Sequence, residues 1–202
     1  MDHLSRLPAF AASPELRLLF WGTFGAWAAV ELSLWLRDRR AVAGVREDRG
    51  SASAISLAIT AAMFVAFSAP PNLPALRIPA SPAVVVGIGT ALAWSGIAFR
   101  LWAVRTLGRY FRVTVTTQDD HRLIDSGPYR RLANPSYTGA VVTLTALGIA
   151  IGNWLSVAAL LLLPIAGFAV RIRVEEASLA RRFGDGFAAY RRARWALIPF
   201  VW

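Results

Sequence analysis

The sequence predicts an all-α membrane protein that crosses the bilayer five times. Of its 202 residues 56% are hydrophobic and eight are Trp, a density of apolar residues typical of a polytopic membrane protein. A helix needs about 20 mostly apolar residues to cross about 30 Å of hydrocarbon. Five apolar runs meet or approach this requirement: Leu18–Leu36, Ala52–Ala69, Ala83–Val104, Tyr137–Ile151 and Trp154–Val170.

The segments between these runs agree with five helices. Only Gly152-Asn153 separates the last two runs, so we expect a tight helical hairpin there. No repeat and no low-complexity linker divides the chain. We therefore expect one integral membrane domain over 1–202, with three spans in 1–104 and a polar loop, the hairpin and a cytoplasmic tail with amphipathic helices in 105–202. A cluster of five prolines predicts a non-helical loop between the second and third runs: Pro70, Pro71, Pro74, Pro79 and Pro82.

Charge predicts the orientation in the membrane. The chain has 22 Arg, no Lys and a net charge of +10. Five Arg lie in 37–49, six in 105–131 and seven in the tail from Arg171, whereas the other side has only Arg6, Arg17 and Arg77. The positive-inside rule then places the N-terminus outside and the C-terminus in the cytoplasm. Arg residues beside apolar runs indicate a membrane and not a nucleic-acid partner.

The lack of Lys indicates a GC-rich genome, and we expect a bacterial inner membrane protein. The sequence has no Cys, which excludes thiolate chemistry and Cys-based metal sites, and we expect no metal.

Two polar segments carry the candidate chemistry. Asn134 is a favoured N-cap and Pro135 suits a first helical position, so the fourth span should begin with a cytoplasmic helix N-terminus suited to anions. Tyr129 and Tyr137 flank this start and offer stacking faces, although an ordinary capped helix with interfacial Tyr explains the same residues. In the tail, Arg171 and Glu175 share one inward helix face and could hold a zwitterion, or simply pair with each other.

Several residues within the spans have structural explanations. Glu31 and Arg100 are candidates for function as charges in hydrocarbon, but their places near the cytoplasmic helix ends favour snorkelling to the interface. The small-residue pairs Gly22/Ala26 and Gly148/Gly152 predict close helix packing. Gly87-Ile-Gly89 follows no strand and is not a dinucleotide fingerprint.

Both polar segments resemble a known family. The segment 127–139, GPYRRLANPSYTG, resembles the GPYxxxRHPxYxG signature of the isoprenylcysteine carboxyl methyltransferase family. The segment 171–190, RIRVEEASLARRFGDGFAAY, resembles its RxxxEExxLxxxFGxxYxxY tail, so that the likeness covers roughly residues 105 to 200. Ala133 and Asn134 stand where the family has Arg-His. Asn can cap a helix but carries no positive charge.

The resemblance implies S-adenosylmethionine as methyl donor, bound at the cytoplasmic face and leaving as S-adenosylhomocysteine. By position, Arg171 is the implied catalytic residue and faces the acceptor carboxylate. The implied cofactor contacts are His121, Arg122, Leu123, Ile124, Tyr129, Asn134, Pro135, Ser136, Tyr137 and Glu175.

The implied reaction is direct methyl transfer to the carboxylate of an isoprenylated or lipid-like acceptor that enters sideways from the bilayer. A phospholipid or small-lipid N-methyltransferase is an alternative, in which His121 or Glu176 would accept a proton. A sterol reductase is another, because such enzymes carry a related C-terminal motif and use NADPH. A non-catalytic membrane scaffold is the third.

Overall fold

A computed structural model of the chain describes residues 6–40, 45–46, 50–108, 116–117 and 123–198. The predicted all-α class is confirmed, since strands occur in these residues only as a two-residue pair, β1 (Val45–Arg46) with β2 (Thr116–Thr117). The helices, in chain order, are η2 (Ala9–Ala12), α1 (Pro14–Arg40), α2 (Ser51–Asn72), η3 (Pro74–Leu76), α3 (Pro82–Leu107), η5 (Gly127–Arg130), α4 (Pro135–Ile151), α5 (Trp154–Phe183) and α6 (Asp185–Arg192).

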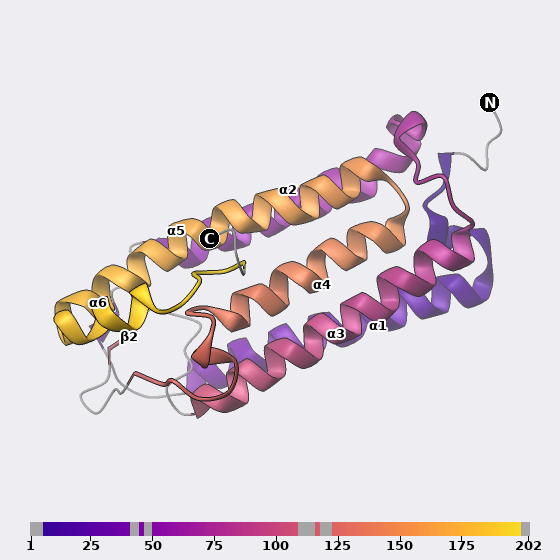
Figure 1. Cartoon of the computed structure of the whole chain (residues 1–202). Helices are drawn as coiled ribbons and strands as arrows, with labels where there is room; N and C mark the ends of the chain where they lie inside the picture. The colour runs from indigo at the N-terminus through magenta and orange to yellow at the C-terminus, as the bar shows by residue number, and fades with distance from the viewer. Residues whose placement is uncertain (1–5, 41–44, 47–49, 109–115, 118–122, 199–202) are drawn as a thin grey trace.

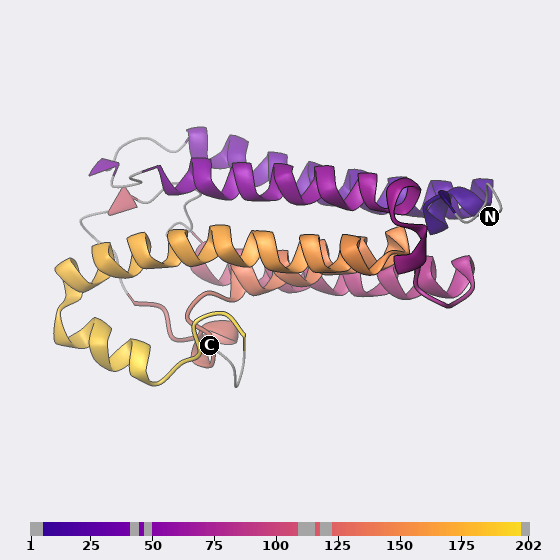
Figure 2. The ribbon, with the colours of Figure 1, turned by 90° about the horizontal axis from the view of Figure 1, so that it is seen from above.

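Five long helices run back and forth, so that η2 and α6 lie at opposite ends of the molecule (Figure 1). From above, α1 and α2 form one layer over the layer of α3, α4 and α5 (Figure 2). The main helix contacts pair α3 with α4, α2 with α5 and α4 with α5. The helix α4 therefore lies in the middle of the bundle.

Four of these helices, α1, α2, α3 and α5, are long and apolar enough to cross a membrane. The fifth, α4, is apolar but has 17 residues, which gives it a length of about 26 Å. Most of α4 is buried. Large apolar side chains elsewhere point outward, for example Leu18, Leu57 and Phe64, all more than 70% exposed, as expected for a surface that faces lipid.

The prolines after the second span correct one prediction. Pro70 and Pro71 belong to α2, which continues to Asn72, so the loop begins later than expected. A proline in a helix leaves the carbonyl four residues earlier without its usual donor. Here the carbonyl of Ala66 accepts a hydrogen bond from Ser156 Oγ at 2.7 Å. A partner on α5 thus replaces the bond that Pro70 cannot make.

The last span and the first part of the tail form one continuous helix. The helix α5 extends 13 residues beyond the predicted end of the span at Val170 and stops at Phe183. Gly184 ends it with φ +50°, a backbone conformation that glycine adopts at little cost. Asp185 is the first residue of α6, which begins directly after Gly184.

The predicted hairpin turn between α4 and α5 is confirmed. Gly152 has φ +87° and its carbonyl accepts a hydrogen bond from the Ile78 amide at 2.9 Å. The side chain of Asn153 accepts from the Leu155 amide at 2.9 Å and donates to the Leu73 carbonyl at 3.0 Å. The turn is thereby tied to the connection between α2 and α3.

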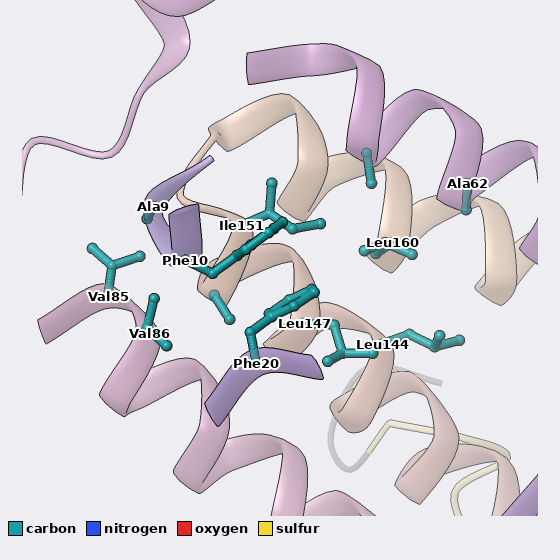
Figure 3. Close-up of a cluster of buried hydrophobic side chains, with 12 residues drawn as sticks. Ala9, Phe10, Phe20, Ala62, Val85, Val86, Leu144, Leu147, Ile151 and Leu160 are labelled. Atoms are coloured by element: carbon teal, nitrogen blue, oxygen red, sulfur yellow. The ribbon is translucent and has the colours of Figure 1, made fainter. Parts of the chain in front are cut away.

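A buried apolar cluster fills the bundle at the end near this hairpin. Phe10 of η2 stacks on Phe20 of α1 with ring centroids 4.1 Å apart. Around them lie Val86, Leu147 and Ile151 from α3 and α4 (Figure 3). This core fixes the end of the bundle that is remote from α6.

Glycines bring α3 and α4 into close contact. A Cβ on Gly96 would lie 2.5 Å from Thr143 Oγ1, and one on Gly139 would lie 2.7 Å from the Arg100 backbone nitrogen. Gly148 likewise faces Ser156 of α5, as the small-residue pattern predicts. The same prediction is wrong for Gly22, since a Cβ there would meet no atom within 4 Å.

The glycine contact yields the first testable prediction. We expect Gly96→Ala to lower the free energy of unfolding by about 1–3 kcal/mol, because the new methyl group overpacks the contact with Thr143. Gly87→Ala is the matched control on the same helix, where the methyl group enters open space. Thermal unfolding in detergent measures both variants, and an equal loss in the two would contradict the packing argument.

Candidate active site

Three segments meet at the α6 end of the bundle. The first contains η5 and the beginning of α4, the second is the extension of α5 beyond Val170, and the third is the C-terminal strap, defined here as residues 193–198. The strap lies beside the segment before α4, with a parallel bridge between Leu132 and Trp195. The predicted loop and tail motifs therefore lie together.

A buried polar cluster joins α5 to α4 and α2. Arg171 is fully buried, and its Nε donates to Glu175 Oε1 at 2.8 Å and to the Tyr137 hydroxyl at 3.3 Å. The Tyr137 hydroxyl donates to the same Glu175 oxygen at 2.7 Å. Nη1 of Arg171 donates to Ser51 Oγ at 3.1 Å, at the first residue of α2. Arg171 and Glu175 thus lie inward, as their spacing predicts, and meet the beginning of α4.

Within this cluster the Glu175 carboxylate is the more accessible group. The Glu175 side chain is 23% exposed, whereas that of Arg171 is 0% exposed. The Tyr137 ring stacks on Phe168 with centroids 4.8 Å apart, which fixes its hydroxyl near both charges. The cluster therefore presents the partly exposed carboxylate of Glu175, which pairs with the buried guanidinium of Arg171.

Asn134 precedes α4 as predicted, but its side chain does not cap the helix. Its amide Nδ2 donates instead to the Ala196 carbonyl of the strap at 2.9 Å. Thr138 Oγ1 donates to the Leu197 carbonyl at 2.6 Å, and the side chain of Leu197 is fully buried. Asn134 therefore occupies the predicted N-cap position without a side-chain cap, and its side-chain amide bonds to the strap instead.

A second buried arginine contacts the same turn of α4 from α3. Arg100 Nη1 donates to the carbonyl and to the hydroxyl of Ser136, at 3.0 and 2.9 Å. Its Nε and Nη2 face the two carboxylate oxygens of Glu31 on α1, at 2.6 and 2.7 Å. Glu31 and Arg100 therefore pair with each other across α1 and α3, and the Glu31 side chain stays partly exposed. The sequence does not predict this pairing, because the two residues are 69 positions apart.

A cavity of about 350 Å³ lies beside both clusters. Its lining is mostly apolar and includes Trp27 of α1, Ile59 of α2 and Phe168 of α5. Glu31, Arg100 and Tyr137 also line the cavity. It therefore combines an apolar wall, suited to a hydrocarbon chain, with a polar group at the first turn of α4.

The other predicted site residues lie around this turn or outside the described residues. His121 and Arg122 belong to the part of the chain that the structure does not describe. Leu123 and Ile124 are half-buried, whereas Pro135 and Ser136 are buried. Tyr129 is buried in η5, and its burial raises the pKa of the phenol far above its usual range. This keeps the hydroxyl neutral at physiological pH.

Charged residues of the tail hold α6 and the strap. Glu176, the candidate proton acceptor for amine chemistry, accepts from Arg191 Nε at 2.5 Å. Arg194 Nε donates to the Tyr129 carbonyl at 2.6 Å, and its guanidinium lies 3.8 Å from the centroid of the Tyr190 ring. In the described residues no group of three or more acidic or histidine side chains could hold a metal.

The fold and this site define a class: an integral membrane protein with an amphipathic cavity and a polar cluster at one end of its helices. The model of the isoprenylcysteine carboxyl methyltransferase (ICMT) family matches residues 88–181. This range contains Arg100, the beginning of α4, Arg171 and Glu175. The family resemblance predicted from the two motifs is therefore confirmed for this part of the chain.

Individual relatives agree with the family match. The chain is 30% identical over 116 residues to a probable protein-S-isoprenylcysteine O-methyltransferase of Oryza sativa subsp. indica, covering 56% of this chain and 61% of the relative. It is 33% identical over 82 residues to the protein-S-isoprenylcysteine O-methyltransferase of Schizosaccharomyces pombe, covering 41% and 35%. The chain thus spans less than two thirds of these relatives. Both are eukaryotic, so the bacterial source stays a prediction.

A solved structure supports the fold of the whole bundle. The eukaryotic intramembrane Ras methyltransferase ICMT superposes with a TM-score of 0.68 at 24% identity. The match covers 94% of this chain and 69% of that protein. The similarity therefore includes the N-terminal helices, which the family model does not match.

The strap gives a prediction about the site's integrity. We expect Leu197→Ala to remove about 2–5 kcal/mol of buried packing, so that the strap detaches more often and trypsin cleaves after Arg194 faster. Leu162→Ala is the control, because that side chain is 61% exposed. Limited proteolysis in detergent compares the two variants, and unchanged cleavage in Leu197→Ala would show that the strap does not depend on this contact.

Proposed function

We propose that this protein is an S-adenosylmethionine-dependent membrane methyltransferase that esterifies the carboxylate of a lipophilic, isoprenylated or lipid-like acceptor. The observation that carries the proposal is the meeting of Arg171, Glu175 and Tyr137 at the first turn of α4, beside an amphipathic cavity. The relatives' names supply the reaction type. An apolar wall and a buried cation suit an acceptor with a hydrocarbon chain and a carboxylate.

The polar cluster fits the amino-acid end of S-adenosylmethionine. That end is a zwitterion, and the partly exposed Glu175 carboxylate can accept from its ammonium group. We assign the cofactor to Glu175 and to the segments around η5 and the beginning of α4, with His121 and Arg122 as further contacts. The bound cofactor supplies an electrophilic methyl group on a sulfonium.

The acceptor carboxylate, in this proposal, lies at the first turn of α4 with Arg171 and Arg100 as its cationic neighbours. A carboxylate and a guanidinium form a strong charge-assisted fork. The acceptor chain lies in the cavity against Trp27, Ile59 and Phe168 and reaches it sideways from the bilayer. The protein thus separates the two substrates, with the water-soluble one near Glu175 and the lipid-soluble one between the helices.

The proposed reaction requires the protein mainly to bind and align the two substrates. A carboxylate oxygen forms the new bond to the methyl carbon, the bond from that carbon to sulfur breaks, and its electron pair stays on sulfur. A carboxylate carries no proton that must be removed, so no general base is needed. The side chains align the oxygen and exclude water from it, effects that account for much of the rate in such displacements.

We assign the α6 end of the molecule to the cytoplasm. The described arginines support this. Arg105, Arg130, Arg131 and the seven Arg of the α5 extension, α6 and the strap lie toward the α6 end, whereas Arg77 lies at the opposite end. By the positive-inside rule the N-terminus is then outside. The methyl donor, a cytoplasmic metabolite, would reach Glu175 without crossing the membrane.

The role of Arg171 is open to a direct test. We expect Arg171→Ala to lower methyl transfer about 100-fold or more, the usual effect of losing an electrostatic partner of the reacting group. The affinity for S-adenosylmethionine should change much less. Labelled methyl transfer to a farnesylcysteine analogue measures the first quantity, and equilibrium cofactor binding the second.

Arg173→Ala is the matched control, since this arginine lies two residues further along α5 and is exposed. Equal loss of transfer and cofactor binding in Arg171→Ala would contradict the division of roles. The product decides the reaction: a base-labile methyl group indicates an ester, whereas a base-stable one indicates N-methylation and would overturn the proposal.

A further inference from the structure

The pairing of Arg100 resembles the way in which an arginine binds a ligand carboxylate. One edge of its guanidinium, Nε and Nη2, faces the two oxygens of Glu31 at 2.6 and 2.7 Å. Nη2 donates a charge-assisted hydrogen bond to Oε2, whereas Nε and Oε1 are close without the geometry of a hydrogen bond. The internal carboxylate of Glu31 therefore occupies the edge of Arg100 that an acceptor carboxylate would need.

Arg100 does not depend on Glu31 alone for its position. Its third nitrogen, Nη1, donates to both the carbonyl and the hydroxyl of Ser136. Close packing at Gly139 further fixes the backbone of Arg100 against α4. The guanidinium thus stays anchored to α4 when the edge that faces Glu31 is vacated.

Glu31 is the more accessible member of the pair. Its side chain is 31% exposed and that of Arg100 10%, and both line the cavity. The helix that carries Glu31 is held independently, because Leu34 and Val30 of α1 pack against Val104 and Leu107 of α3. The Glu31 carboxylate can therefore leave Arg100 by rotation of its side chain, without movement of α1.

We propose that Glu31 is a displaceable internal carboxylate that holds the acceptor-binding edge of Arg100 until an acceptor carboxylate replaces it. This proposal rests on the proposed function, since it assigns the cavity to the acceptor. Glu31 lies outside the part of the chain that matches the family, residues 88–181, whereas Arg100 lies within it.

The exchange gives the site a means of discriminating substrate from product. An acceptor carboxylate carries the charge that competes with Glu31 for Arg100. Esterification removes this charge, so the product can no longer compete and Glu31 returns to the guanidinium. Glu31 thereby raises the apparent dissociation constant of the acceptor and favours release of the ester.

The test measures binding and does not require turnover. A farnesyl thioether carboxylic acid is titrated into the purified protein, and its neutral methyl ester is titrated in parallel. We expect Glu31→Gln to bind the acid about five- to tenfold more tightly than the unaltered protein. In this variant no ion pair with Arg100 has to break before the acid binds. The affinity for the methyl ester should stay unchanged.

Two further variants separate competition from a structural role. Glu31→Asp keeps the charge but shortens the side chain, and its affinity for the acid should lie between those of the unaltered protein and Glu31→Gln. Glu15→Gln makes the same chemical change at the other end of α1, where the side chain is exposed, and should leave both affinities unchanged.

Weaker or equal binding of the acid by Glu31→Gln would overturn the proposal. If Glu31 only held Arg100 in position, its replacement would lower the affinity for the acid and not raise it. Binding of neither probe by any form would overturn both this proposal and the assignment of the cavity. Tighter binding by Glu31→Gln without methyl transfer would leave the exchange intact and contradict the proposed function alone.

Discussion

Two buried guanidinium groups organise the end of the bundle where the candidate site lies. A charge removed from water must be paired and hydrogen-bonded, or the cost of its burial is several kcal/mol. Arg171 meets this requirement through Glu175, Tyr137 and Ser51, and Arg100 through Glu31 and Ser136. Because Ser136 and Tyr137 are neighbours, both networks meet at one turn of α4. The arginines therefore connect α1, α2, α3 and α5 to the beginning of α4.

The rest of the bundle serves to hold that turn in place. Glycines let α3 approach α4 closely, so that Arg100 reaches Ser136 along a rigid contact. The C-terminal end of α4 is fixed by the hairpin at Gly152 and Asn153 and by the core around Phe10 and Phe20. The strap closes the near end through Asn134 and Thr138. A short and mostly buried α4 is thus supported at both ends and along the sides that face α3 and α5.

The same arrangement explains how one small chain can serve two substrates of opposite solubility. The partly exposed Glu175 belongs to the end of α5 beyond the apolar span, whereas the cavity lies among the apolar helices. Tyr137 belongs to both, since its ring lines the cavity and its hydroxyl reaches Glu175. In the proposed function the reacting groups meet at this half-buried residue.

The sequence alone determined the features that depend on local spacing. Apolar runs predicted the five helices and Gly152-Asn153 the hairpin turn. The four-residue separation of Arg171 and Glu175 predicted their shared inward face, because helix periodicity acts over a few residues. Only the tertiary structure decided which distant groups satisfy a buried polar atom. It gave Ser51 to Arg171, Glu31 to Arg100 and the Ala196 carbonyl to Asn134, and it let Ser156 replace the donor that Pro70 lacks. These partners are separated by 62 to 120 residues, and hydrogen bonding over such separations is set by helix packing, which leaves no periodic signal in the sequence.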